Sequence, residues 1–141
     1  MAGFEFRKGA ARDIQPCKLD STSAAIVVGD MITVADATTG FFKEVDTAAE
    51  AVYGVATTAS ASPSADGGAT VMVDVSPNST YECSPDAGTV TEALVGKSMD
   101  CGADAKTADI NGSTTDDLVC RQVDIPNNRL WVQLKPTFTG V

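Results

Sequence analysis

The sequence predicts a single all-β domain, either a compact antiparallel β-barrel or a sandwich-like fold, and three observations support this prediction. Apolar residues occur in short runs that are rich in β-branched side chains. Gly, Asp, Asn or Pro interrupts these runs every few residues, which is typical of strands joined by tight turns. The chain has 141 residues, 43% of them hydrophobic, which fits one packed core. We therefore expect little helix.

Individual strands are predicted from alternation and from the turns between them. In Thr70–Val75 the apolar side chains alternate with polar ones, which is the period of a half-buried strand. Gly29-Asp30 predicts a turn between two strands, and Pro126–Asn128 predicts the turn of a C-terminal hairpin. Strands are expected near residues 24–28, 31–35, 41–45, 52–57, 70–75, 118–123 and 129–135.

Other segments between these strands are less regular. Residues 59–68 are small and polar throughout, which predicts an exposed loop at a hairpin tip and leaves open whether it has a binding role. Thr91–Gly96 predicts one helical turn closed by glycine. Lys97–Cys101 alternates again and predicts a further strand.

The net charge excludes some classes of partner. Ten Lys and Arg against 19 Asp and Glu give a charge of −9, a field that repels nucleic acid and anionic lipid. No apolar run approaches the length of a membrane span, and the N-terminus lacks the pattern of a signal peptide. We therefore expect no nucleic-acid partner, no membrane partner and synthesis in a cytoplasm.

The composition also argues against an enzyme. The sequence contains no histidine, which excludes His-based triads, His-ligated zinc and imidazole acid/base catalysis. It has no nucleophile elbow, phosphate-binding loop or dinucleotide fingerprint. No pair of carboxylates stands apart from the others as an acid/base pair. We expect no catalytic residues, no enzymatic activity and no cofactor.

Acidic segments at 100–104, 109–113 and 116–117 suggest calcium, because this cation prefers oxygen ligands. The spacing does not fit an EF-hand: counted from Asp109, the twelfth position is Cys120 rather than glutamate. Turns in which Asp and Asn side chains bind their own backbone explain these segments equally well, and we expect no metal.

The four cysteines are Cys17, Cys83, Cys101 and Cys120, and no two of them form a Cys-x-x-Cys pair. In a reducing compartment this pattern predicts buried free thiols, although the sequence leaves open whether any of them pair.

The first 18 residues differ from the rest of the chain, since they carry four basic and two acidic side chains. This segment mixes aromatic with cationic residues, a composition suited to docking on an apolar and acidic surface. We expect an extended N-terminal arm at residues 1–18 and a β domain at 19–141, with an edge strand of the same domain as the alternative to the arm. Deleting residues 2–12 should then leave the domain folded. The candidate contact residues of the arm are Phe4, Phe6, Arg7, Lys8 and Arg12.

Trp131 is the remaining candidate contact residue. In the last expected strand, Leu130, Val132 and Leu134 share one face, so Trp131 projects from the opposite face. That face forms either a second buried layer or part of a contact between subunits.

Several motifs follow one another in a characteristic order along the chain. A Val-x-Gly-Asp strand pair precedes a Gly-Val-Ala strand, a loop of small residues and a Val-x-Val strand. The segments concerned are Val27–Thr33, Val52–Ala56, Thr70–Val75, Thr80–Glu82, Val95–Lys97 and Leu130–Leu134. Together they resemble the head decoration, or capsid cement, proteins of tailed bacteriophages. The resemblance implies a β-barrel-like domain, usually trimeric, that binds outside the icosahedral shell and clamps neighbouring major capsid proteins. The basic arm matches no motif of that family.

The expected function is therefore that of a non-enzymatic structural protein of the virion, located on the outer surface of the capsid after synthesis in the host cytoplasm. The expected partners are the major capsid protein and the chain itself, as a homotrimer. Two alternatives remain open: a phage tail or spike module that binds a host surface, and a β-barrel that binds a small ligand. The host and the capsid geometry are not predicted.

Overall fold

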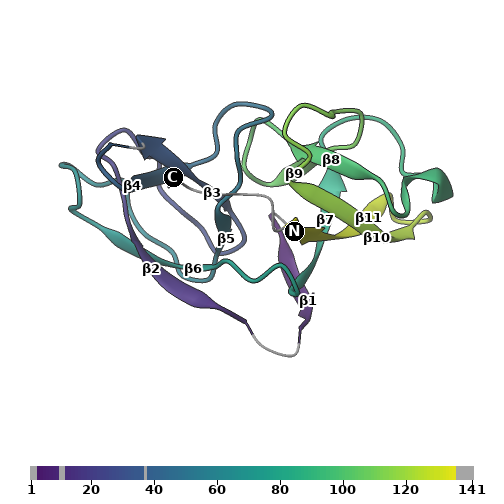
Figure 1. The fold of residues 1–141 in the computed structure, drawn as a ribbon, viewed down its shortest axis with the longest axis horizontal. Coiled ribbons are helices and arrows are strands. Elements are labelled where there is room, and N and C mark those ends of the chain that lie inside the picture. The colour runs from purple at the N-terminus through teal and green to yellow at the C-terminus, as the bar shows by residue number, and fades with distance from the viewer. Residues whose placement is uncertain (1–2, 10–11, 37, 136–141) are drawn as a thin grey trace.

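The computed structural model describes residues 3–9, 12–36 and 38–135, and it confirms the predicted all-β class. Eleven strands form two sheets, here named sheet A and sheet B (Figure 1). Within the described residues, the one helical element is a short 3-10 turn, η1, at Glu92–Leu94.

Sheet A contains six strands, five of which close into a ring. Its strand order is β1 (Glu5–Lys8), β7 (Thr80–Pro85), β11 (Arg129–Leu134), β10 (Leu118–Asp124), β8 (Ser98–Cys101) and β9 (Thr107–Asp109). Neighbouring strands in this order are antiparallel, and β9 also pairs in parallel with β7. This last pairing closes the ring and leaves β1 outside it as an edge strand.

Sheet B contains five antiparallel strands and also turns back on itself. Its order is β2 (Ile14–Lys18), β6 (Thr70–Asp74), β5 (Gly54–Ala56), β3 (Met31–Asp36) and β4 (Phe41–Glu44). Leu19, directly after β2, forms a bridge to Phe42 of β4, which brings the two ends of the sheet together. Figure 1 shows sheet B and the ring of sheet A on opposite sides of the molecule, with β1 between them.

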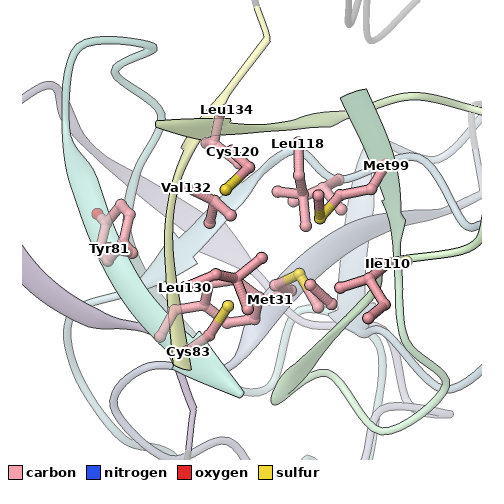
Figure 2. Close-up of a cluster of buried hydrophobic side chains, with 14 of the residues drawn as sticks. Met31, Tyr81, Cys83, Met99, Ile110, Leu118, Cys120, Leu130, Val132 and Leu134 are labelled. Carbon is pink, nitrogen blue, oxygen red and sulfur yellow. The ribbon is translucent and has the colours of Figure 1, made fainter. Parts of the chain in front are cut away.

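Two clusters of buried side chains hold the fold together. The larger cluster contains residues of sheet A together with Met31, Val45, Val52 and Val55 from the sheet B half. Figure 2 shows Met31 of β3 among side chains of sheet A, so this cluster joins the two halves. The smaller cluster lies within sheet B and consists of Cys17, Leu19, Ile26, Ile32, Ala56, Val71 and Val73. Burial of these aliphatic side chains is the main favourable term in folding.

The six strands predicted near residues 31–35, 41–45, 52–57, 70–75, 118–123 and 129–135 are all present within a few residues of the expected bounds. In β11 the alternation is confirmed, because Leu130, Val132 and Leu134 are buried while Trp131 is only half-buried. The helical turn expected at 91–96 corresponds to η1, and β8 matches the strand expected at 97–101.

The strand expected at residues 24–28 is absent. Ile26 forms only an isolated bridge with Ser60, and Val27 and Val28 are exposed. The cause is the turn that follows: the Asp30 carboxylate accepts the Val27 N–H at 2.9 Å, and Gly29 adopts a φ of 97°. Asp binding of the local backbone competes here with strand pairing.

The loop at residues 59–68 does connect β5 to β6, as expected from the sequence. It is nevertheless attached to the chain after β2. The Gly67 N–H donates to the Leu19 carbonyl at 2.8 Å, and the Asp66 carboxylate accepts the Ser21 N–H at 2.8 Å. The loop therefore helps to close sheet B rather than projecting freely.

The extended N-terminal arm is not found in the described part of residues 1–18. Residues 5–8 form β1 and pair with β7, while residues 14–18 form β2 and pair with β6. Phe4 is buried, with 3% of its surface exposed. The alternative prediction, an edge strand of the same domain, is the one that the structure shows for residues 5–8. The structure does not support the expectation that residues 2–12 are dispensable for folding.

Candidate functional site

The predicted contact residues lie around β1, but not as a free arm. Phe4 belongs to the larger core, and its N–H donates to the Gly29 carbonyl at 2.9 Å. Phe6 packs edge-on against Tyr81, with 5.9 Å between ring centroids. The Arg12 guanidinium lies 4.0 Å from the centroid of the Phe6 ring. These three residues therefore attach the N-terminal segment to the body of the protein.

A β-bulge gives Arg7 and Lys8 a different role. The pairing of β1 with β7 shifts register between Phe6 and Lys8, so β1 contains one extra residue there. Arg7 binds Glu82 at 2.8 Å, and Lys8 lies over the Trp131 ring with 5.9 Å from Nζ to the centroid. The bulge thus places two consecutive cationic side chains on one face of the sheet, where strict alternation would separate them.

This face is named here the outer face and consists of Glu5, Arg7, Lys8, Glu82, Arg129, Trp131 and Gln133. Across three strands, Glu5 is opposite Glu82, and Glu82 is opposite Trp131. Arg7 and Arg129 each contact both glutamates, which produces a network with two positive and two negative charges. The charges of the network are balanced, so its members are held in place by one another.

Trp131 lies at the border of this charged network. Beside it, the Gln133 side chain donates to Thr80 Oγ1 at 3.1 Å and accepts from Arg121 Nε at 2.8 Å. Lys8, Thr80, Trp131 and Gln133 together are named here the Trp131 patch. A half-buried indole with a frame of fixed polar side chains loses little conformational entropy on binding, as is typical of interface anchors.

Arg12 contacts residues of both sheets. Its Nε donates to Asp74 Oδ2 at 3.0 Å, and the hydroxyl of Tyr81 donates to the same carboxylate. Burial raises the pKa of Tyr81, and the hydrogen bond to Asp74 adds to the rise. Burial alone also raises the pKa of Asp74, but hydrogen bonds, that of Tyr81 foremost, outweigh burial and lower it. Asp74 is therefore a buried carboxylate held in its ionised form.

A pocket of about 320 Å³ lies beside this junction. One wall comes from the N-terminal segment and the other from sheet B and the exposed Val28. The Arg12 guanidinium, which lines the pocket, is already paired with the Asp74 carboxylate. The pocket is lined by Phe4, Glu5, Phe6, Arg12, Val28, Ala56, Thr57 and Tyr81.

The acidic side chains considered for calcium bind backbone N–H groups. Asp104 and Asp109 accept the N–H groups of Lys106 and Asn111 two residues further on, whereas Asp100 of β8 reaches a different loop. The Asp100 carboxylate accepts the N–H groups of Thr114, Thr115 and Asp116, each at 2.8 Å. Among the described residues, no group of three or more His, Cys, Asp and Glu side chains is arranged to hold a metal ion. The contacts of Asp104 and Asp109 match the expected turns in which Asp binds nearby backbone N–H groups, whereas those of Asp100 connect β8 to a loop at least 14 residues away.

All four cysteines are buried and free, as the sequence predicts. Burial raises the pKa of Cys17 and of Cys101 to about 11, so their thiols are protonated near neutral pH. Protonated, buried thiols are poor nucleophiles.

Several residues of the outer face and of the junction were not among the predicted contact residues: Asp74, Tyr81, Glu82 and Arg129. The alternation within residues 129–135 places Arg129 on the same strand face as Trp131. The sequence therefore predicts on which side of the sheet Arg129 lies. The sequence contains no comparable signal for Glu82, because its partners Arg7 and Arg129 are 75 and 47 residues away.

No protein-family model, curated protein or solved structure matches the chain. In the part of the chain that the structure describes, no helix is long and apolar enough to cross a membrane.

Proposed function

We propose that this chain is a non-enzymatic capsid decoration protein that binds the outside of a bacteriophage head and stabilises contacts between major capsid proteins. The sequence resemblance to phage cement proteins supplies the class of partner. The observation that carries the proposal is the Trp131 patch, in which a half-buried indole lies on the outer face of a sheet next to Lys8. The balanced network beside it leaves Lys8 as the cation available to an acidic partner group.

The expected energetics favour the indole over the charges. Truncation of a Trp anchor in an interface costs about 2 kcal/mol or more, whereas an exposed ion pair contributes about 0 to 1 kcal/mol. Arg7 and Arg129 are already paired with Glu5 and Glu82, so a partner gains little from them. The proposed contact is therefore centred on Trp131, with Lys8 at its rim.

Self-association as a homotrimer is the second part of the proposal. It is motivated by the resemblance, since the cement proteins are usually trimeric, and by the small core that a single domain of this size can bury. Light scattering should give three times 14.5 kDa at micromolar concentration. A monomer in solution would restrict any trimer to one that assembles on the capsid.

Composition analysis of purified virions tests the proposal. Heads of the phage that encodes this chain should contain it, and the ratio of its copy number to that of the major capsid protein should be the same from one preparation to the next. Co-expression of the two proteins should also yield a complex. Recovery of the chain in separated tails, and not in heads, would instead favour the host-binding alternative.

The pocket beside Arg12 favours a second candidate function, the binding of a small ligand. Its walls of Phe4, Phe6 and Val28 are apolar, and ligand pockets are mostly apolar with few polar groups. A shift in melting temperature with a panel of small apolar compounds, abolished by Val28→Glu, would support this alternative.

A further inference from the structure

Lys106, Asp30 and Glu44 meet at a second junction between the two halves of the molecule. Lys106 lies between β8 and β9, Asp30 directly precedes β3, and Glu44 is the last residue of β4. The Lys106 ammonium contacts Asp30 Oδ1, and its Nζ lies 3.6 Å from Glu44 Oε2. An amine and two carboxyl groups from three separate segments are thus within reach of one another.

Backbone hydrogen bonds fix the Asp30 carboxyl group and bring its segment next to that of Lys106. Asp30 Oδ2 accepts the Val27 N–H at 2.9 Å, so the other oxygen of this carboxyl group faces Lys106. The Met31 N–H donates to the Ala105 carbonyl at 2.9 Å, which holds the residues next to Asp30 and Lys106 together. The described contacts therefore fix the Asp30 carboxyl group and the two segments, while the Lys106 amine is positioned by its contacts with Asp30 and Glu44.

Burial differs among the three side chains. The Asp30 side chain is fully buried, whereas those of Glu44 and Lys106 are 15% and 31% exposed. Burial keeps water away from the Asp30 carboxyl group. It therefore removes the hydration that stabilises the free acid and protects an amide formed there from hydrolysis. Lys106 reaches it from the side that is open to solvent.

Glu44 is suited to proton transfer. Burial raises the pKa of Glu44 to about 7, and a hydrogen bond to Asp30 contributes to the rise. Near neutral pH this carboxyl group therefore both donates and accepts protons. Burial alone lowers the pKa of Lys106, but Asp30 and Glu44 outweigh it and raise it, so the resting pair is an ion pair. One proton passed from Lys106 to Asp30 converts that pair into a neutral amine and a neutral carboxyl group without any change in net charge.

We propose that Lys106 and Asp30 form an intramolecular isopeptide bond, with Glu44 transferring the protons. This proposal does not depend on the proposed capsid function. The neutral Lys106 amine attacks Cγ of the protonated Asp30 carboxyl group, and a C–N bond forms. Glu44 accepts a proton from the attacking nitrogen and returns it to the departing hydroxyl group. The C–O bond then breaks, one water molecule leaves on the exposed side, and an amide remains; nothing is oxidised or reduced.

Proximity is the main driving force for this step. Well-oriented groups in one molecule react with effective concentrations of about 10⁵ M or more, which offsets the usual preference for hydrolysis in water. The product would connect residues that are 76 positions apart in the sequence. It would tie sheet B to the β8–β9 segment of sheet A and restrict the separation of the two halves on unfolding.

Intact-mass spectrometry of the denatured full-length protein tests the proposal. After purification and incubation at pH 7, the mass should be lower than the sequence mass by one water molecule. A tryptic digest should contain a branched peptide that joins the segments around Asp30 and Lys106, with no cleavage after Lys106. This branched peptide is decisive, because dehydration at Asp66-Gly67 gives the same mass change without a branch.

Two variants separate the chemistry from folding. Lys106→Arg retains a cation beside Asp30 but lacks the amine, and Glu44→Gln retains the shape of Glu44 but lacks the carboxyl group. Both should keep the circular dichroism spectrum of the folded protein and give the full sequence mass, with no branched peptide. The proposal is overturned if folded wild-type protein shows the full mass after prolonged incubation, or if Glu44→Gln forms the branched peptide as fast as the wild type.

Discussion

The hydroxyl of Tyr81 in β7 donates a hydrogen bond to the carboxylate of Asp74 in β6, and through this contact sheet A is attached to sheet B. Arg12 binds the same carboxylate, and its guanidinium stacks on Phe6 of β1. A residue expected in a docking arm is therefore part of the joint between the sheets.

Replacing Asp74 with asparagine should destabilise the protein by about 2 kcal/mol. The side chain keeps an acceptor for the backbone N–H of Ser76 but loses the charge that Arg12 binds, and Arg12 is partly exposed to water that screens the loss. Urea unfolding followed by fluorescence measures the change. Glu92→Gln is the matched control, because it removes an exposed carboxylate of η1 and should change stability by less than about 0.5 kcal/mol. Equal effects of the two substitutions would contradict this role of Asp74.

Truncation of Phe4 tests whether the N-terminal segment is part of the folded core. Phe4→Ala should lower the free energy of unfolding by about 3 kcal/mol, because the ring is buried and its removal leaves a cavity. Ile14→Ala, at a position 38% exposed, is the control and should cost less than about 1 kcal/mol. If Phe4→Ala were as stable as the wild type, the segment would behave as the free arm expected from sequence.

Gly54 is required by close packing against β6. A Cβ atom at this position would lie 2.5 Å from Cγ1 of Val73 and 2.6 Å from the Asp74 carbonyl oxygen. Gly54→Ala should therefore destabilise the protein by about 2 to 3 kcal/mol through overpacking. Thermal unfolding measures the effect. Adding Val73→Ala to Gly54→Ala removes the contact with Cγ1 of Val73 and leaves the one with the Asp74 carbonyl oxygen. If the double variant were as stable as the wild type, the contact with the Asp74 backbone would not contribute to the destabilisation.

The loop around Asp100 should lose stability in acid. Burial alone raises the pKa of Asp100, but the backbone N–H donors of Thr114, Asp116 and Thr115 outweigh it and lower it. Because the folded pKa lies below that of the unfolded chain, the contribution of this carboxylate is present above about pH 4 and is lost as the pH falls through the folded pKa.

Asp100→Asn should therefore be about 2 kcal/mol less stable at pH 7 and approach the wild type as the pH falls below about 4. Unfolding free energies at pH 7, 5, 4 and 3 provide the comparison. The charge of Asp100 also helps to raise the pKa of Asp117, so the difference between the two proteins reports Asp100 together with this effect on Asp117. A constant difference from pH 7 to pH 3 would contradict the assignment.

The sequence predicts the strands that alternate or end in clear turns, as in β6, β10 and β11. It leaves β1 undecided between a free arm and an edge strand, because the register shift between Phe6 and Lys8 interrupts the alternation. It misses β2, where Pro16 argues against a strand yet is tolerated at an end of the sheet order. Both strands are determined by pairing with β7 and β6, whose residues are more than 50 positions away, and local sequence patterns cannot identify such distant partners.

In the candidate site too, features set by local alternation are predictable from the sequence and features set by long-range pairing are not. The face of Trp131 is predictable from alternation within one strand. The contact of Lys8 with the Trp131 ring is not predictable, because it requires both the bulge in β1 and the strand order β1-β7-β11.

Cosedimentation with bacteriophage capsids that lack decoration protein tests the central proposal, that the Trp131 patch binds a capsid. Trp131→Ala should weaken binding by about 2 kcal/mol, roughly a 30-fold rise in Kd, and the loss should persist at high salt. Val95→Ala, which shortens an exposed apolar side chain at the end of η1, is the control and should bind like the wild type. A folded Trp131→Ala protein that binds these capsids with unchanged Kd would contradict the account.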